Sequence, residues 1–232
     1  MLSIIIPTLN EEKYLPILLT SIKNQSFKDY EIIVSDNFSK DKTRLIAKKY
    51  GCRVIDGGLP AKARNEGAKN ARGEFLLFLD ADTILPSEFL RVLLSQQRRK
   101  NFDIASVYLR PENRNIFDNL LCFFMNIYFY LLQQIWPHAS GMCIFARKKI
   151  HDDIDGFNHK IKLGEDHDYV IRASRKGKFS YLLKPYILFS IRRLSKEGRL
   201  GLVIKYIYSE IYRLFNKEIK KDIFEYEFGK HE

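Results

Sequence analysis

The sequence contains little cysteine and none of the segments that mark export, repetition or a flexible linker. Its 232 residues include only Cys52, Cys122 and Cys143, which lie far apart. They offer neither a disulfide framework nor a cysteine metal site, and they suit a reducing compartment. The sequence shows no internal repeat and no Gly/Ser linker, and it opens without the basic region of a signal peptide. We therefore expect one large cytoplasmic domain, or one domain with an appendage.

Acidic residues are too few to balance the basic ones. The chain has 39 lysine and arginine residues against 28 aspartate and glutamate residues, a formal net charge of +11. Such a charge calls for an anionic partner, and nucleic acid, a phosphorylated small molecule and an anionic membrane all qualify. Aromatic residues form 13% of the chain and are concentrated in residues 119–136 and 202–215.

Strand and helix patterns alternate along the chain. Short apolar runs predict strands at residues 2–9, 30–36, 52–56, 75–80, 104–109, 141–147 and 180–189. Apolar residues at helical spacing predict helices at residues 11–24, 41–50, 61–71 and about 169–175. This alternation, with nearly continuous apolar strands, indicates a mostly parallel α/β sheet covered by helices on both faces. Ligands bind such sheets at the carboxyl ends of the strands.

Two carboxylates, Asp80 and Asp82, directly follow the most hydrophobic predicted strand. Other polar residues follow the first and second strands, namely Thr8, Asn10, Glu11, Asp36 and Asn37. Polar residues are ordinary at strand ends, but two neighbouring carboxylates are unfavourable unless a positive group lies against them. A divalent cation with oxygen ligands, Mg²⁺ or Mn²⁺, explains the pair most simply. Acidic turns are also common, so the pattern by itself leaves both interpretations open.

Two further charged segments have both a structural and a functional interpretation. Glu165, Asp166 and Asp168 precede a predicted helix, where acidic residues act as caps and complement the helix dipole, or act in catalysis. Arg192 and Arg193 lie in the basic segment 190–199 after the last predicted strand. That segment is either a solvated loop or a lid whose arginines grip a diphosphate.

Three motifs in order carry a resemblance to a known family. They are "SIIIPTLNEEKYLPILLTSIKNQSFKDYEIIVSDNFSKDKT", "AKARNEGAKNARGEFLLFLDADTILP" and "GFNHKIKLGEDHDYVIRASRKG". Over residues 2–193 the chain resembles glycosyltransferase family 2. The resemblance implies a GT-A fold, one α/β domain around a mostly parallel sheet. It also implies transfer of a sugar from a nucleotide-diphosphate donor to an acceptor, with inversion at the anomeric carbon. We place the catalytic domain at residues 1–193 and a basic amphipathic helical tail at 194–232.

The resemblance suggests which residues bind the donor. The first loop resembles the part that wraps the nucleoside, and it contains Pro7, Thr8, Asn10 and Glu11. Asp36 matches the aspartate that hydrogen-bonds the donor base. Its surroundings, "SDNFSKDKT", depart from the usual acidic, glycine-containing turn, although Ser39, Asp41 and Thr43 still match. The base preference, UDP-sugar or GDP-sugar, therefore stays open.

The remaining motifs are implied to hold the diphosphate and to perform the reaction. Arg64 and Asn65 match the element near the donor diphosphate or sugar. Asp80, Ala81 and Asp82 match the Asp-x-Asp motif, in which the first aspartate contacts the ribose and the second holds the metal. Asp166 matches the catalytic base, and Glu165 is its neighbour. Arg192 and Arg193 follow the last strand as similar basic pairs do in related sequences.

The uncharged stretch at residues 119–136 raises the question of a membrane. It contains four asparagine or glutamine residues, and a crossing would separate the metal motif from the base, so we reject a span. It packs in the domain core, against a second copy in a homodimer, or on a bilayer surface, and the tail helix has the same alternatives. With the positive charge, both stretches favour a peripheral protein on an anionic membrane surface, the inner face of the cell membrane. A polyprenyl-phosphate or lipid-linked glycan acceptor would follow.

Other functional classes fit the sequence less well. A nucleotidyltransferase acting on a sugar phosphate would show a glycine-rich loop after the first strand, and "PTLNEEKYL" has no glycine. A basic nucleic-acid-binding protein would cluster lysine and arginine on a recognised module, whereas here acidic residues fill the predicted crevice. We therefore expect no nucleic-acid partner. The chain also lacks the Gln-x-x-Arg-Trp element of processive synthases, which favours a single addition.

Overall fold

A computed structural model describes residues 1–113, 115–161 and 164–192, together with residues 198, 201 and 208. Arg193 and nearly all of the predicted tail, residues 194–232, lie outside the described residues.

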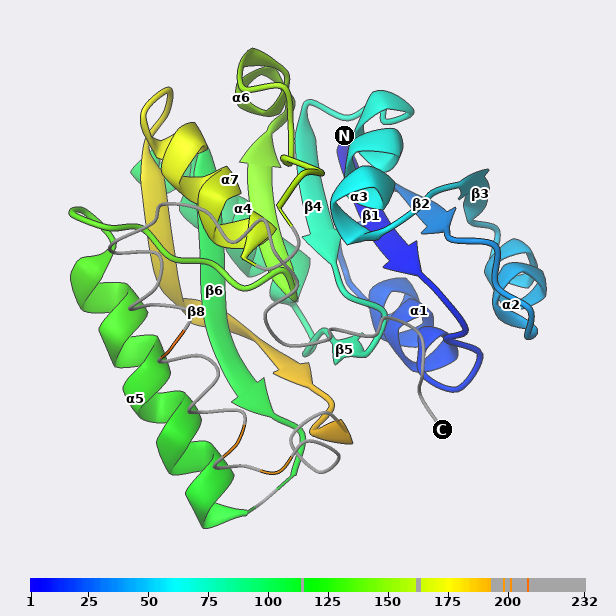
Figure 1. The fold of residues 1–232 in the computed structure, drawn as a ribbon, viewed down its shortest axis with the longest axis horizontal. Coiled ribbons are helices and arrows are strands. Elements are labelled where there is room, and N and C mark those ends of the chain that lie inside the picture. The colour runs from blue at the N-terminus through cyan, green and yellow to red at the C-terminus, as the bar shows by residue number, and fades with distance from the viewer. Residues whose placement is uncertain (114, 162–163, 193–197, 199–200, 202–207, 209–232) are drawn as a thin grey trace.

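The described chain forms one mixed sheet in the order β3-β2-β1-β4-β7-β6-β8-β5 (Figure 1). The strands are β1 (Leu2–Thr8), β2 (Tyr30–Asp36), β3 (Arg53–Asp56), β4 (Phe75–Leu79), β5 (Thr83–Ile84), β6 (Ile104–Pro111), β7 (Cys143–Arg147) and β8 (Phe179–Phe189). The first four are mutually parallel, β7 is antiparallel to both of its neighbours, and β6 is parallel to β8. Because β4 ends in the middle of the sheet, the acidic residues that follow it lie at a central position.

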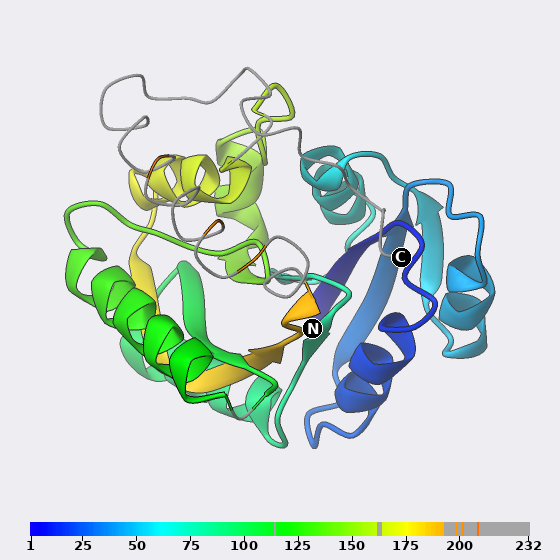
Figure 2. The same cartoon turned by 60° about the horizontal axis from the view of Figure 1, so that its bottom comes forward.

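Helices cover both faces of the sheet (Figure 2). They are α1 (Leu15–Lys23), α2 (Thr43–Lys49), α3 (Pro60–Lys69), α4 (Phe89–Lys100), α5 (Ile116–Leu132), α6 (Lys148–Asp153) and α7 (Glu165–Ser174). Residues of α1, α2 and α4 belong to one core cluster, and those of α3, α6 and α7 belong to the other. Within β1, Ile4 and Ile6 join the first cluster and Ile5 the second, as the two-residue period of a strand requires.

One predicted boundary was wrong at the candidate base. We expected the helix to begin near residue 169, after the acidic residues, but α7 begins at Glu165. Gly164 precedes it in the left-handed region, with φ of 83°. Glu165, Asp166 and Asp168 therefore lie inside the first turn, where the free N–H groups of the helix favour negative charge.

Residues 119–136 belong mainly to α5, a helix of 17 residues whose buried side is partly polar. Asp118, Cys122, Asn126 and Phe129 face inward, while many of its large apolar side chains are exposed. The stretch is thus only partly a core helix. Over the part of the chain that the structure describes, no helix has both the length and the hydropathy needed to cross a membrane.

Candidate active site

The loops after β1 and β2 are tied to each other. Thr8 Oγ1 donates a hydrogen bond to Asp36 Oδ1 at 2.9 Å, and Ser39 N donates to Asp36 Oδ2 at 3.0 Å. Asp36 is fully buried, and Arg44 Nη1 lies 3.2 Å from its Oδ2. A buried carboxylate needs such partners because burial without them is costly. The structure thereby holds the predicted base-contact residue, Asp36, in one orientation.

The predicted nucleoside loop is held by the following turn. Asn10 lies in the left-handed region with φ of 54°, its N donates to Ser39 Oγ at 2.8 Å, and its Oδ1 accepts from Lys40 N at 2.9 Å. Glu11 N donates to Thr43 Oγ1 at 2.8 Å. Pro7 pairs with a residue of β2 inside the sheet. The matching Ser39 and Thr43 therefore serve to fix the loop after β1.

Arg64 on α3 joins two predicted carboxylates from distant parts of the chain. Its Nη2 donates to Asp80 Oδ1 and its Nη1 donates to Glu165 Oε1, each at 2.9 Å. Its guanidinium also lies 5.3 Å from the ring centroid of Phe157. Burial alone would lower the pKa of Arg64, but Asp80, Glu165 and the nearby Asp166 outweigh it and raise that pKa. Burial and the neighbouring Asp166 raise the pKa of Glu165, and Arg64 opposes them.

The candidate base, Asp166, is oriented by the chain leading into β7. Its Oδ2 accepts a hydrogen bond from Gly141 N at 2.7 Å, and its Oδ1 accepts from His167 N at 2.9 Å. A Cβ at position 141 would lie 2.5 Å from Arg64 Nη2, so any larger residue there would displace the guanidinium from its present position. Gly141 thus packs against Arg64 while its amide holds Asp166.

The side chain of Asn65 is hydrogen-bonded to the backbone of Phe157. Its Nδ2 donates to Phe157 O and its Oδ1 accepts from Phe157 N, each at 2.8 Å. Gly156 lies beside it with φ of +64°, and a Cβ there would come within 2.4 Å of Asn65 Oδ1. Asn65 therefore anchors the loop that places the ring of Phe157 against the guanidinium of Arg64.

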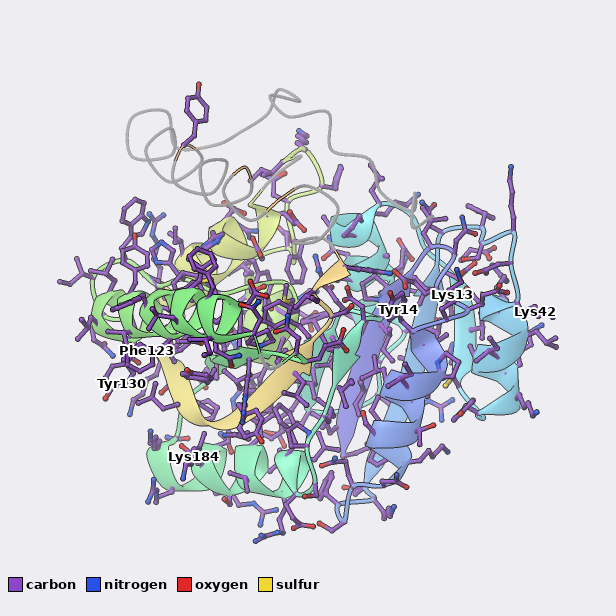
Figure 3. All side chains as sticks on the ribbon, turned by 90° about the horizontal axis from the view of Figure 1, so that it is seen from below. Lys13, Tyr14, Lys42, Phe123, Tyr130 and Lys184 are labelled. Atoms are coloured by element: carbon purple, nitrogen blue, oxygen red, sulfur yellow. The ribbon has the colours of Figure 1, made fainter. Side chains whose placement is uncertain are left out.

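Arg192 lies between the first loop and the Asp-x-Asp segment. Its Nη1 and Nη2 donate to the two oxygens of Glu11 at 2.9 and 2.7 Å, and its Nε lies 3.0 Å from Asp82 Oδ2. Its guanidinium also lies 4.5 Å from the ring centroid of Tyr14, which Figure 3 shows near the end of β8. Burial raises the pKa of Asp82 to about 6, Asp80 and Glu11 act in the same direction, and Arg192 lowers it.

The carboxylates at this edge fit a cation that arrives with a diphosphate. Among the described residues, no three His, Cys, Asp or Glu side chains are grouped so that they could hold a metal by themselves. Mg²⁺ with a nucleotide takes one or two protein carboxylates and completes its shell with phosphate oxygens and water. Asp82 and Asp80 supply such a set, and the pKa of Asp82 is raised chiefly by burial, with Asp80 and Glu11 adding to the rise. Ala81 is buried between them and brings no ligand of its own.

Three residues of this site were not anticipated from the sequence. They are Tyr14, Gly141 and Phe157. Each contacts a charged group that is distant along the chain, so no local pattern in the sequence predicts it. Neither the glycine in "SGMCIFAR" nor the phenylalanine in "DGFNHK" lies in a sequence pattern that predicts these contacts.

The sequence was compared with models of known protein families. A model described as "Glycosyl transferase family 2" matches residues 3–155. The chain belongs to glycosyltransferase family 2. Its resemblance to that family, predicted from the three motifs, is confirmed.

Known proteins of similar sequence include two bacterial transferases. TarS of Staphylococcus aureus, a poly(ribitol-phosphate) beta-N-acetylglucosaminyltransferase, is 26% identical over 229 residues, which are 94% of this chain and 40% of TarS. The GalNAc(5)-diNAcBac-PP-undecaprenol beta-1,3-glucosyltransferase of Campylobacter jejuni is 38% identical over 104 residues, 41% of this chain and 34% of that protein. This chain thus spans less than half the length of either relative.

Solved structures confirm the predicted GT-A fold. The crystal structure of residues 1–349 of S. aureus TarS in complex with UDP-GlcNAc has a TM-score of 0.68 and 26% identity, covering 82% of this chain and 58% of that one. The mannosyltransferase PcManGT from Pyrobaculum calidifontis, in complex with GDP-Man and Mn²⁺, has a TM-score of 0.69 and 17% identity, covering 89% of this chain and 64% of that one. At that identity the second likeness concerns the fold alone.

Proposed function

We propose that this family 2 chain transfers one sugar from a nucleotide-diphosphate donor to an acceptor hydroxyl or lipid phosphate, with inversion and with a divalent cation. The observation that carries the proposal is that Asp36 ends β2 and Asp80 and Asp82 follow β4, while Arg64 joins Asp80 to Glu165, the neighbour of Asp166. Each part of the reaction has a suitable side chain there: Asp36 for the donor base, Asp82 for the cation of the diphosphate, and Asp166 for the acceptor. TarS, which is similar over most of this chain, was crystallised with UDP-GlcNAc.

In this mechanism Asp36 contacts the base and Asp80 contacts the ribose of the donor. Asp82, aided by Asp80, would hold Mg²⁺ or Mn²⁺, which supplies Lewis-acid stabilisation of the departing diphosphate. Arg192, freed from its carboxylate partners, contributes bidentate hydrogen bonds to the same diphosphate. The Nε of Arg64 is buried without a hydrogen-bond partner among the described residues, so this guanidinium keeps one donor beside Asp80.

Asp166 is the general base of the transfer. The acceptor oxygen attacks the anomeric carbon from the face opposite the diphosphate, and the bond between sugar and diphosphate breaks. Where the acceptor is a hydroxyl, Asp166 takes its proton, which a carboxylate does effectively when the proton moves late; an ionised phosphate acceptor has no such proton to lose. The amides of Gly141 and His167 fix the direction of its two oxygens beforehand. Glu165 stays on Arg64 and positions the start of α7.

A lipid-linked acceptor, polyprenyl phosphate or lipid-linked glycan, completes the proposal, with the protein peripheral on the inner face of the cell membrane. The name of the C. jejuni relative contains an undecaprenol-linked acceptor, and the region of likeness is 38% identical. The exposed apolar side chains of α5 and the net charge of +11 are the supporting features of this chain.

The donor site is tested by calorimetric titration with UDP and with GDP, each with and without Mn²⁺. We expect one nucleotide to bind only with Mn²⁺, and Asp82→Ala to lose that binding. Asp153→Ala is the matched control, since this carboxylate pairs with Lys149 on α6. α6 follows Arg147, which pairs with the first residue of β4, at the other end of that strand from Asp80. If neither nucleotide binds under any condition, or if Asp82→Ala binds like the wild type, the proposed donor site is wrong.

A further inference from the structure

α5 presents large apolar side chains outward along its length. Phe124 is 60% exposed and Leu131 is 68% exposed, and Phe117, Leu120 and Phe123 are each about half exposed. Figure 3 shows Phe123 at the rim of the molecule, at the opposite end from Lys42. We call these five outward residues the α5 face. Contiguous apolar surface of this kind marks an interaction site more often than a free surface.

The orientation of α5 is set by buried polar bonds, so the exposed apolar side is a built feature. Asn126 Oδ1 accepts from Leu109 N at 2.8 Å, and Asn126 Nδ2 donates to Leu109 O at 2.9 Å. The hydroxyl of Tyr181 donates to the same Oδ1 at 2.5 Å. Turning the helix to bury its aromatic side would break these bonds inside the core, where an unsatisfied amide costs most.

A cationic groove of about 390 Å³ runs beside the α5 face. One wall is α5 itself and the other is a bulge of β8, created where Val107 pairs with Leu182 but Tyr108 pairs with Tyr186. The bulge presents Lys184, and β6 presents Arg110, whose guanidinium lies 5.7 Å from the ring centroid of Tyr186. The described lining of the groove contains no acidic side chain.

We propose that the α5 face docks on an anionic lipid bilayer, with Arg110 and Lys184 placed in the groove to bind lipid phosphates. Charge complementarity favours this occupant. Asp118 is the one charged residue of α5 and is buried, so the outward side is apolar, and the groove beside it presents Arg110 and Lys184. A second copy of the same face would bring the cations of the two grooves together, and the described lining of the groove supplies no acidic side chain to pair with them. Aromatic side chains and cations side by side are typical of surfaces at the level of lipid headgroups.

The position of the face relative to the candidate base gives the docking a consequence, which rests on the proposed function. α5 ends at Leu132, and the chain continues through the exposed Ile135 to Gly141, whose amide holds Asp166. A bilayer on the α5 face would therefore lie on the acceptor side of the site. It would bring a lipid-linked acceptor towards Asp166 and leave the nucleotide edge, near Asp36, to the aqueous side.

Vesicle co-sedimentation of the full chain tests the docking surface at low salt. The vesicles are phosphatidylcholine alone, or phosphatidylcholine with phosphatidylglycerol, and free inorganic phosphate is added as a competitor. We expect the wild type to bind the anionic vesicles, and Phe124→Glu with Leu131→Glu to weaken that binding at least about tenfold. Lys184→Glu should weaken it too. The matched controls are Leu45→Glu, at a 66% exposed site on α2, and Lys42→Glu, and both should bind like the wild type.

Each other outcome overturns the proposal. If the wild type ignores anionic vesicles, or the double variant binds them fully, the α5 face is not the membrane contact. If light scattering shows a dimer that the double variant dissociates, the face is an interface between copies. Loss of vesicle binding to inorganic phosphate alone would make the groove a free-phosphate site. UDP and GDP titrations run in parallel separate this result from the proposed function, because the α5 variants should keep the nucleotide binding of the wild type.

Discussion

Replacing Arg64 by methionine should be strongly destabilising, since Arg64 is the only described cation that holds both Asp80 and Glu165. Its side chain is 3% exposed, and Glu165 is largely buried. Removing one partner of a buried ion pair costs about 3–5 kcal/mol, because the other charge is left without compensation. For a chain of this size that loss lowers Tm by about 6–20 °C. Urea denaturation and thermal melting measure the two quantities.

Adding Glu165→Gln to Arg64→Met tests whether the uncompensated charge of Glu165 causes the destabilisation. Arg64→Met with Glu165→Gln should be more stable than Arg64→Met alone, because no uncompensated carboxylate remains. Arg91→Met is the control, since among the described residues this exposed arginine pairs with the nearby Glu88 alone, and we expect little change.

The free energy of unfolding of Arg64→Met should depend on pH with a definite sign. The folded pKa of Glu165 is already raised above its ordinary value of 4.5, and losing Arg64 removes an influence that lowers it. Folded Arg64→Met then binds more protons than the unfolded chain above pH 4.5, so its free energy of unfolding falls as the pH rises. The reasoning is refuted if the free energy of unfolding of Arg64→Met lies within about 1 kcal/mol of that of the wild type. It is also refuted if Arg64→Met with Glu165→Gln is less stable than Arg64→Met alone.

Four further predictions follow from individual side chains. Asn65→Ala should cost about 2–4 kcal/mol in urea denaturation, because both backbone groups of Phe157 lose a partner, while nucleotide affinity stays unchanged. Asp166→Asn should slow sugar transfer at least about 100-fold in a radiolabel assay and keep the titrated nucleotide affinity. Arg192→Gln should strengthen Mn²⁺ binding without nucleotide by about tenfold, because two carboxylates lose their resident cation, and it should weaken the nucleotide complex. Burial lowers the pKa of His151 from 6.5 to about 4, so the unfolded chain takes up its proton first as the pH falls between these values. The free energy of unfolding should then drop by about 3 kcal/mol across that range, and His151→Gln should remove this part of the acid sensitivity.

Strand and helix patterns were predictable because their periods are local. The apolar runs at β1, β2 and β4 and the helical spacing of Leu15, Leu18, Leu19 and Ile22 are visible in short windows of sequence. α4, β5 and α6 went unpredicted, and α7 begins four residues earlier than expected. Boundaries depend on capping and packing, which a hydrophobic pattern does not contain.

The sequence by itself determined the family, the alternating α/β architecture and the types of residue at the strand ends. Only the tertiary structure decided which of those residues touch. Arg64 meets Glu165 across 101 positions, and Arg192 meets Glu11 across 181. Such pairs depend on the order of strands in the sheet, and no local spacing encodes that order. The same holds for α5: its composition suits a core helix, but the buried bonds of Asn126 and the burial of Cys122 and Phe129 set which side faces inward.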